Sequence, residues 1–180
     1  MRLHVIDRDG VINEEAEDFV KTPAEWIPIP GSLEAIARAS KAGVRCVVMS
    51  NQSGLARGLL NIETLNAIHR KMSNMLWKMG GSVEAVFFCP HGPDEGCACR
   101  KPRPGMLEQI QKRTQVPFHA MAVIGDRATD VEAAQTVNAQ PVLVKTGHGQ
   151  ATLESDIDLR GTLVYDTLAS AVDAIISLHH

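Results

Sequence analysis

Two aspartates separated by one residue follow the first apolar run of the chain, in the segment VIDRDG. Asp7 is a candidate nucleophile, because a carboxylate can accept a phosphoryl group and so divide a hydrolysis into two easier steps. Asp9 is a candidate general acid and base, which would protonate the leaving oxygen and later deprotonate water. An Asp-Gly pair is equally typical of a turn, so this segment alone leaves both interpretations open.

A second polar set follows another apolar run, in the segment MSNQSGLARG. The hydroxyl of Ser50 and the backbone amides after it could hold a phosphoryl oxygen, and Asn51, Gln52 and Ser53 offer further donors. Ser, Asn and Gly are also residues that commonly form turns. By itself this segment is more typical of a polar loop than of a phosphate site.

Three cysteines and a histidine lie close together with the spacing C-x-H-x5-C-x-C, namely Cys89, His91, Cys97 and Cys99. A Cys3His set satisfies a tetrahedral zinc ion completely, so the ion would have no open position and would hold the loop together rather than bind substrate. A disulfide would leave one of the three cysteines unpaired, and a reducing compartment disfavours it. Cys46 lies in an apolar run and is expected in the core.

Basic residues come directly after the last of these ligands, in the segment RKPRPGM. The metal on one side and Pro102 on the other would hold the backbone of Lys101 still. A fixed cation suits phosphoryl transfer, because negative charge develops on the transferring group. A solvated basic loop is the ordinary alternative for Arg100, Lys101 and Arg103, but the neighbouring metal site favours a functional role.

The segment GDRATD supplies a fourth polar set. Asp126 follows an apolar run, and together with Asp7 and the backbone carbonyl of Asp9 it would offer hard oxygen ligands to Mg²⁺. The ion would cancel the repulsion between these carboxylates and a phosphate. Asp130 comes four residues later, in the first turn of an expected helix, where it is equally consistent with a cap or a charge stabilised by the helix dipole.

Six short apolar runs alternate with five helical patterns, which predicts an α/β fold with a mostly parallel, Rossmann-like sheet and helices on both faces. The expected strands span residues 3–7, 45–51, 83–89, 120–126, 141–145 and 162–166, and the expected helices span 32–43, 63–81, 104–115, 129–139 and 167–178. Ligands bind outside the carboxyl ends of such strands, which is where all four polar sets lie. Residues 13–30 form an irregular insert that could cover the site, and residues 1–178 are expected to form one domain.

The composition narrows the classes of partner. The chain has a net charge of -3 and no strongly basic half, so a nucleic-acid partner is not expected. It has no apolar run of membrane-spanning length and no secretory signal pattern at its N-terminus, which predicts a cytoplasmic protein. His179 and His180 are typical of a purification tag and are left out of the functional reasoning.

Taken in order, the DRDG segment, Ser50, Lys101 and GDRATD resemble the phosphatases of the haloacid dehalogenase (HAD) superfamily. More closely, the chain resembles the D,D-heptose 1,7-bisphosphate phosphatases. The segments that carry this resemblance lie between residues 3 and 149 and read DRDGVIN, IPGSLEAI, SNQSGLARG, CPHG, CACRKPRPGM, IGDRATD and KTGHG. The family fold is a Rossmann-like sheet without a large cap domain, which also predicts a monomer.

The resemblance implies a role for each matching position. Asp7 would be the nucleophile and Asp9 the acid and base, with Ser50 and Lys101 stabilising the phosphoryl group. Mg²⁺ would be held by Asp7, Asp9 and Asp126, and a structural Zn²⁺ by Cys89, His91, Cys97 and Cys99. Substrate contacts would come from Glu15, Ala16, Glu17, Asp18, Asn51, Gln52, Ser53, Arg100 and Arg127. The reaction implied is removal of the 7-phosphate from heptose 1,7-bisphosphate with the 1-phosphate kept, in the supply of heptose for lipopolysaccharide core or nucleotide-activated heptose.

The chain departs from the family pattern in three places. Ser50 stands where many relatives have Thr, which keeps the hydroxyl. Arg127 stands where Lys is usual, which keeps the charge but changes its geometry. Five residues separate His91 from Cys97, fewer than in some heptose enzymes, and this spacing is also similar to that of the histidinol-phosphate phosphatases.

Two other functions therefore remain to be weighed. A histidinol-phosphate phosphatase would need carboxylates near a cationic amine, which Glu14, Glu15, Glu17 and Asp18 could supply, whereas the segments KPRPGM and SGLARG favour the heptose enzymes. A non-catalytic phospho-acceptor module would also use a strand-end aspartate, Mg²⁺, a hydroxyl and a lysine. Such a module has no need of Asp9, which makes that residue the discriminating one.

Overall fold

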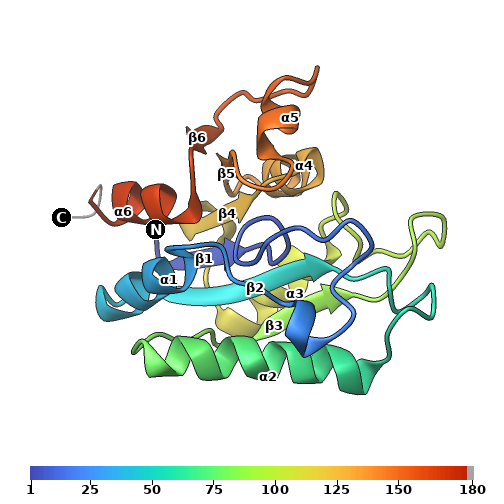
Figure 1. The fold of residues 1–180 in the computed structure, drawn as a ribbon. Helices are drawn as coiled ribbons and strands as arrows, with labels where there is room; N and C mark the ends of the chain where they lie inside the picture. The colour runs from blue at the N-terminus through green and yellow to red at the C-terminus, as the bar shows by residue number, and fades with distance from the viewer. Residues whose placement is uncertain (178–180) are drawn as a thin grey trace.

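The computed structural model describes residues 1–177 and contains one six-stranded sheet (Figure 1). The strands run parallel throughout, in the order β3-β2-β1-β4-β5-β6. Their bounds are Leu3–Ile6 for β1, Arg45–Asn51 for β2, Val86–Cys89 for β3, Met121–Gly125 for β4, Gln140–Val144 for β5 and Leu163–Tyr165 for β6. The predicted parallel α/β architecture is therefore confirmed, with β1 and its DRDG turn near the centre of the sheet.

Helices pack against both faces of the sheet. They are α1 (Ser32–Lys41), α2 (Ile62–Lys78), α3 (Gly105–Thr114), α4 (Ala128–Thr136), α5 (Gly149–Leu153) and α6 (Leu168–Ser177), with short 3-10 turns at Pro23–Glu25 and Phe118–Ala120. Buried residues of α1, α2 and α6 share one hydrophobic cluster, whereas those of α3 and α4 share the other. The short helix α5 was not predicted, and the last residue of the predicted helix 167–178 lies outside the described residues.

Buried side chains explain why these segments adopt these elements. Every residue of β1 is buried, as expected for a strand covered on both faces. In α2 the buried positions recur at three- and four-residue steps, with Leu65, Ile68, Met72 and Leu76 facing the sheet,. The side chain of Asn61 caps the start of α2 by accepting a hydrogen bond from the Thr64 amide at 2.9 Å,.

The insert of residues 13–30 is irregular, as predicted, but it is fixed to the core. Val20 and Trp26 are buried in the cluster beneath α1 and α2. Lys71 on α2 donates hydrogen bonds from Nζ to the carbonyls of Pro23 at 2.7 Å and Trp26 at 2.8 Å. The insert therefore forms an anchored wall beside the end of β1.

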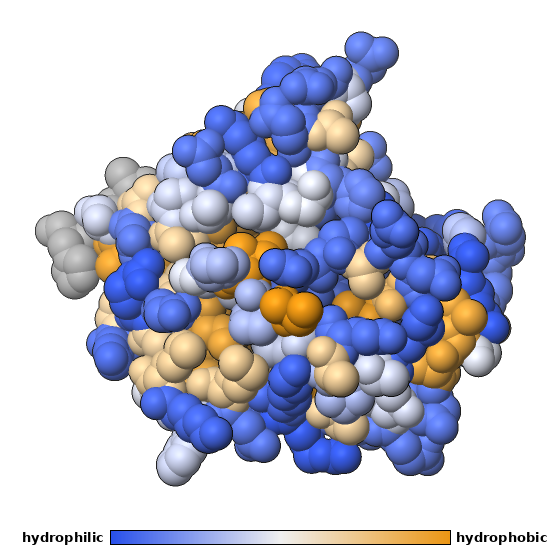
Figure 2. Space-filling model, viewed as in Figure 1, coloured by the Kyte–Doolittle hydropathy of each residue, from blue (hydrophilic) through white to orange (hydrophobic). Residues whose placement is uncertain are grey.

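The outer surface shown in Figure 2 is mixed, with polar side chains covering the end of the molecule that carries α5. No helix within residues 1–177 is both long enough and apolar enough to cross a membrane.

Candidate active site

A cavity of about 560 Å³ opens at the carboxyl ends of β1 and β2, between the insert and the cysteine loop. All the predicted catalytic and substrate-binding residues line it, with the exception of Asp18. Asp18 is instead exposed and forms an ion pair of 3.3 Å with Lys21, so the structure does not bring it to the site. Several other residues that line the cavity were not predicted as site residues, namely Phe19, Val20, Arg57, Thr129 and His148.

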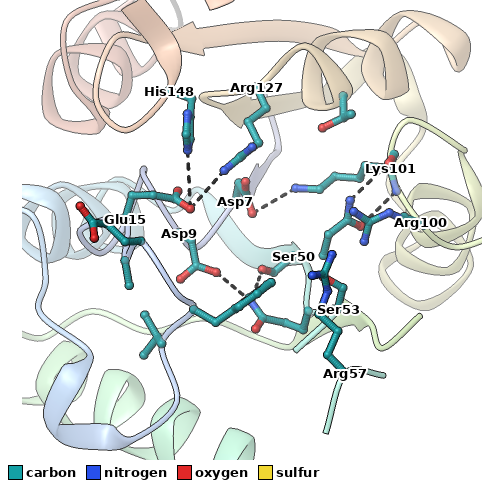
Figure 3. Close-up of a pocket in the computed structure, with 17 residues that line it drawn as sticks. Asp7, Asp9, Glu15, Ser50, Ser53, Arg57, Arg100, Lys101, Arg127 and His148 are labelled. Carbon is teal, nitrogen blue, oxygen red and sulfur yellow. Dashed lines mark hydrogen bonds and ion pairs between the residues drawn. The ribbon is translucent and has the colours of Figure 1, made fainter. Parts of the chain in front are cut away.

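A buried lysine joins two carboxylates at the base of the cavity, and Figure 3 shows its contact with one of them, Asp7. Lys101 Nζ lies 3.0 Å from Asp7 Oδ1 and 2.6 Å from Asp130 Oδ1. Burial alone would lower the pKa of Lys101, but the carboxylates of Asp130 and Asp7 outweigh it and raise that pKa. Asn51 fixes the lysine backbone, since its side chain accepts from the Lys101 amide at 3.1 Å and donates to the Lys101 carbonyl at 3.2 Å. The charged form of the ammonium is therefore favoured, and the group is held beside Asp7.

Asp126 completes a cluster of three buried carboxylates. One oxygen each from Asp7, Asp126 and Asp130 lie within 4.8 Å of one another. Burial and the nearby Asp130 carboxylate raise the pKa of Asp126 to about 7. Its Oδ2 accepts from the His148 amide at 2.7 Å, but its Oδ1 is buried without a hydrogen-bond partner in residues 1–177. An orphaned carboxylate oxygen in an excess of negative charge fits a hard divalent cation such as Mg²⁺.

Asp9 lies in the same cavity, but its carboxylate is turned to other partners. Its Oδ1 accepts from Asn13 Nδ2 at 2.9 Å and its Oδ2 accepts from Gln52 Nε2 at 2.8 Å, while the Arg8 guanidinium contacts both oxygens. Burial would raise the pKa of Asp9, but the Arg8 charge and these hydrogen bonds lower it overall. The Asp9 carboxylate is thus engaged by Arg8, Asn13 and Gln52 and lies outside the group of Asp7, Asp126 and Asp130 carboxylates that could hold a cation.

Glycine is required where the DRDG segment turns. Gly10 has a φ of 80° and approaches the carboxylate of Asp126, so a side chain at this position would be strained and would collide with that carboxylate,. Ser50, at the end of β2, is buried and its hydroxyl accepts from Gln52 Nε2 at 2.8 Å. Gln52 thereby links Ser50 to Asp9 (Figure 3).

Charged side chains surround the mouth of the cavity (Figure 3). Glu15 Oε1 lies 3.1 Å from Arg127 Nη2 and 3.7 Å from His148 Nε2. Arg57 lies over the ring of Phe19, with its guanidinium carbon 5.5 Å from the ring centre. Arg57, Arg100 and Arg127 outnumber Glu15 and Glu17 among the charged residues of the rim, which is therefore more basic than the carboxylate-rich base of the cavity.

The four predicted zinc ligands converge on one point. Cys89 Sγ lies 3.6 Å from Cys97 Sγ, 3.2 Å from Cys99 Sγ and 3.5 Å from His91 Nδ1. A tetrahedral zinc ion with ordinary bond lengths needs ligand atoms about 3.5–3.8 Å apart, so the cluster fits zinc with little adjustment. The sulfurs are too far apart for a disulfide, and the cysteines of the chain are all free,.

The cysteine loop is joined to the basic segment that follows it. Arg100 Nη1 donates to the carbonyl of His91 at 3.2 Å, and Arg103 donates to the carbonyl of Cys97. Cys46 is buried in β2, apart from this cluster, as expected for a core residue. The loop therefore carries Arg100 and Lys101 to the cavity while keeping its own ligands away from it.

A family model described as HAD-hydrolase-like matches residues 98–171. Over 176 residues the chain is 49% identical to the D-glycero-beta-D-manno-heptose-1,7-bisphosphate 7-phosphatase of Bordetella bronchiseptica, a match that covers 98% of each chain. It belongs to the D-glycero-D-manno-heptose-1,7-bisphosphate 7-phosphatase family. The Pseudomonas putida member of this family is 48% identical, and the match covers 98% of this chain and the whole length of the relative.

Solved structures of the heptose bisphosphate phosphatase family agree with this assignment. The B. bronchiseptica enzyme, complexed with magnesium and phosphate, superposes with a TM-score of 0.95 at 48% identity, covering 99% of both chains. The Burkholderia thailandensis enzyme superposes with a TM-score of 0.78 at 39% identity, covering 98% of this chain and 99% of its own. The chain is thus a HAD phosphatase, a phosphoric monoester hydrolase by family.

Some residues of the site were missed in the sequence analysis, and their signals differ. Asp130 was considered only as a helix cap or a first-turn charge. It does cap α4, because its Oδ2 accepts from the Arg127 amide at 3.1 Å, but it also binds Lys101. His148 lies in the segment KTGHG, which matched the family but was given no role. Arg57 lies within the segment SGLARG, between Gly54 and Gly58, which matched the family but gave this residue no role.

Proposed function

We propose that this protein is a Mg²⁺-dependent phosphatase that removes the 7-phosphate of D-glycero-β-D-manno-heptose 1,7-bisphosphate and leaves the 1-phosphate. Relatives that are 48–49% identical over nearly the whole chain carry the name of this activity, including the β anomer. The observation that carries the substrate class is the division of charge in the cavity. An acidic, cation-binding base suits the phosphate that reacts, and a basic rim suits a second phosphate that is only bound.

Asp7 and Asp9 carry the two steps of the proposed reaction. A carboxylate oxygen of Asp7 attacks phosphorus, and the bond from phosphorus to the sugar oxygen breaks. Asp9 gives a proton to that leaving oxygen and then takes one from water, which hydrolyses the aspartyl phosphate and restores Asp7. Lys101 and the Ser50 hydroxyl stabilise the charge that develops on the phosphoryl oxygens.

Two metal ions fit this chemistry. Mg²⁺ would be held by Asp7, Asp126 and the backbone carbonyl of Asp9, where it neutralises and orients the phosphoryl group. Asp130 contributes negative charge to the same cluster, although Lys101 and the Arg127 amide occupy its oxygens. Zn²⁺ at Cys89, His91, Cys97 and Cys99 would be structural, because four protein ligands leave no open position.

The remaining proposals concern the setting of the enzyme. We propose that it acts as a monomeric cytoplasmic enzyme on a small sugar bisphosphate, with no nucleic-acid partner. The product would supply heptose for lipopolysaccharide core or for a nucleotide-activated heptose. The substrate contacts proposed at Glu15, Ala16, Glu17, Asn51, Gln52, Ser53, Arg100 and Arg127 all lie around the cavity.

Phosphate release from three substrates tests the proposal directly. We expect the β anomer of heptose 1,7-bisphosphate to be hydrolysed with a higher kcat/KM than the α anomer, and far better than histidinol phosphate. Asp7→Asn should abolish turnover and Asp9→Asn nearly so, whereas Asp166→Asn, at an exposed position, should not. A large preference for histidinol phosphate would refute the substrate, and a stable phosphoprotein without turnover would indicate a phospho-acceptor module.

A further inference from the structure

Arg8, the residue between the two catalytic aspartates, has a completely buried side chain. A buried cation is costly unless its charge and its donors are all matched. Arg8 meets this requirement on one side through Asp9, with Nε 3.2 Å from Oδ1 and Nη2 2.9 Å from Oδ1 and 3.1 Å from Oδ2. Because this contact uses two nitrogens of a rigid, planar group, the direction of the guanidinium dictates the direction of the carboxylate.

The other side of the guanidinium is held by a histidine from a different part of the fold. His69, in the middle of α2, places Nε2 3.2 Å from Arg8 Nη1. An arginine keeps its proton in proteins, so the guanidinium donates and His69 Nε2 accepts, which puts the imidazole proton on Nδ1. The ring is itself fixed, because it is buried and packs against Phe88, with the ring centres 6.2 Å apart.

We propose that His69 is a positioning residue for the proton transfers of the phosphatase reaction, acting through Arg8 to aim the Asp9 carboxylate. This inference rests on the proposed function, in which Asp9 is the general acid and base. Gln52 and Asn13 each hold one oxygen of Asp9. The hydrogen bonds from Arg8 to Asp9 and to His69 connect that carboxylate to the rigid helix α2. Without the acceptor on His69, Nη1 would be left unpaired in the interior, and the guanidinium would turn toward another acceptor and carry Asp9 with it.

Proton transfer to the leaving oxygen gives this role a specific signature. A sugar alkoxide leaves slowly unless it is protonated, whereas p-nitrophenolate leaves readily without a proton. We therefore expect His69→Leu to lower kcat for the heptose bisphosphate by about 10- to 100-fold, part of the 10²–10⁴ that general acid–base catalysis supplies. The first-turnover release of p-nitrophenolate from p-nitrophenyl phosphate should fall much less, and KM should change little.

Further variants isolate the connection between His69, Arg8 and Asp9. His69→Gln keeps an acceptor oxygen and should recover much of the lost kcat. Arg8→Lys keeps the charge but not the planar group, so it should resemble His69→Leu, and the double variant should lose no more than either single one. Leu76→Val, two turns further along the same face of α2, should keep wild-type kinetics. If His69→Leu does not fold, His69→Phe replaces it, since it keeps an aromatic ring against Phe88 and lacks an acceptor.

The outcomes separate this inference from the proposed function. An active wild-type enzyme with a folded His69→Leu variant of unchanged kcat would refute the positioning role alone. Equal losses with both leaving groups, or no recovery in His69→Gln, would also refute it, because a general loss of structure would then account for the effect. If the wild-type protein hydrolyses no phosphate ester, both the proposed function and this inference are refuted.

Discussion

Replacing Lys101 by Met removes the only cation inside the buried carboxylate cluster that the described residues form. At separations of 2.6 Å from Asp130 and 3.0 Å from Asp7, the Coulomb attractions are about 6 and about 5.5 kcal/mol with an effective dielectric constant of 20. The desolvation of the ammonium offsets part of this, and breaking a buried pair costs about 3–5 kcal/mol in practice. Asp7 and Asp126, whose pKa values are already raised, can take up protons and limit the loss. We expect about 4 kcal/mol less free energy of unfolding at neutral pH.

The same variant should respond more strongly to Mg²⁺ than the wild type. Without the ammonium, the three carboxylates repel one another and attract a divalent cation more strongly. Urea unfolding in buffer without Mg²⁺ and in excess Mg²⁺ should therefore show a larger gain in stability for Lys101→Met than for the wild type. Its kcat should nevertheless fall about 10²–10³-fold, the usual loss when a charge-stabilising donor is removed.

Lys145→Met is the matched control for Lys101→Met. Lys145 also forms an ion pair, 2.8 Å from Asp166, but the lysine is only partly buried and Asp166 is exposed, so the stability of this variant should change by less than about 1 kcal/mol. The reasoning would be refuted if Lys101→Met were as stable as the wild type in buffer without Mg²⁺. A smaller Mg²⁺-dependent gain than in the wild type would refute it equally.

Three more outcomes are expected. Cys97→Ser should lose bound zinc in metal analysis, lose most activity and expose the cysteine loop to proteolysis while Mg²⁺ still binds, whereas Cys46→Ser should keep its zinc. Burial, with the N-terminal amine, lowers the pKa of His4 to about 4, while the unfolded chain takes up this proton near pH 6.5. His4 should therefore lower the free energy of unfolding by about 2 kcal/mol between pH 7 and pH 5. In urea unfolding, His4→Leu should abolish this contribution to the pH dependence. Lys71→Met, which loses two hydrogen bonds to carbonyls of residues 23–26, should lower stability by about 2 kcal/mol and raise KM.

The parts of the site that were predictable from sequence are those set by spacing and by strand ends. Asp7, Ser50 and Asp126 each end an apolar run, and parallel strands bring their carboxyl ends to one edge. Cys89 and Cys99 lie close together because the short loop between them returns to the same point, which is the arrangement that a zinc site would need. These relations depend on local order along the chain, so one sequence is sufficient to find them.

The parts that were missed depend on the direction of single side chains after a turn. Asp18 and Asp130 are both acidic residues near candidate motifs, yet one points into solvent and the other into the cluster. Arg8 is a charged residue between Asp7 and Asp9 with no sequence signal of burial, and its burial becomes evident only from the packing of α2 against the sheet. The five residues of α5 are too few to produce a helical period,.

The position of Lys101 connects the two metal sites proposed for this enzyme. Its backbone is held by Asn51 at the end of β2 and by the cysteine loop that precedes it, while its ammonium reaches carboxylates from β1 and α4. Asp7 and Asp126 follow strands of the central sheet and need no help from that loop. Disorder in the loop would consequently withdraw the cation and leave the carboxylates in place. Bound zinc would then affect catalysis through Lys101, because the ammonium of this residue depends on the cysteine loop for its position.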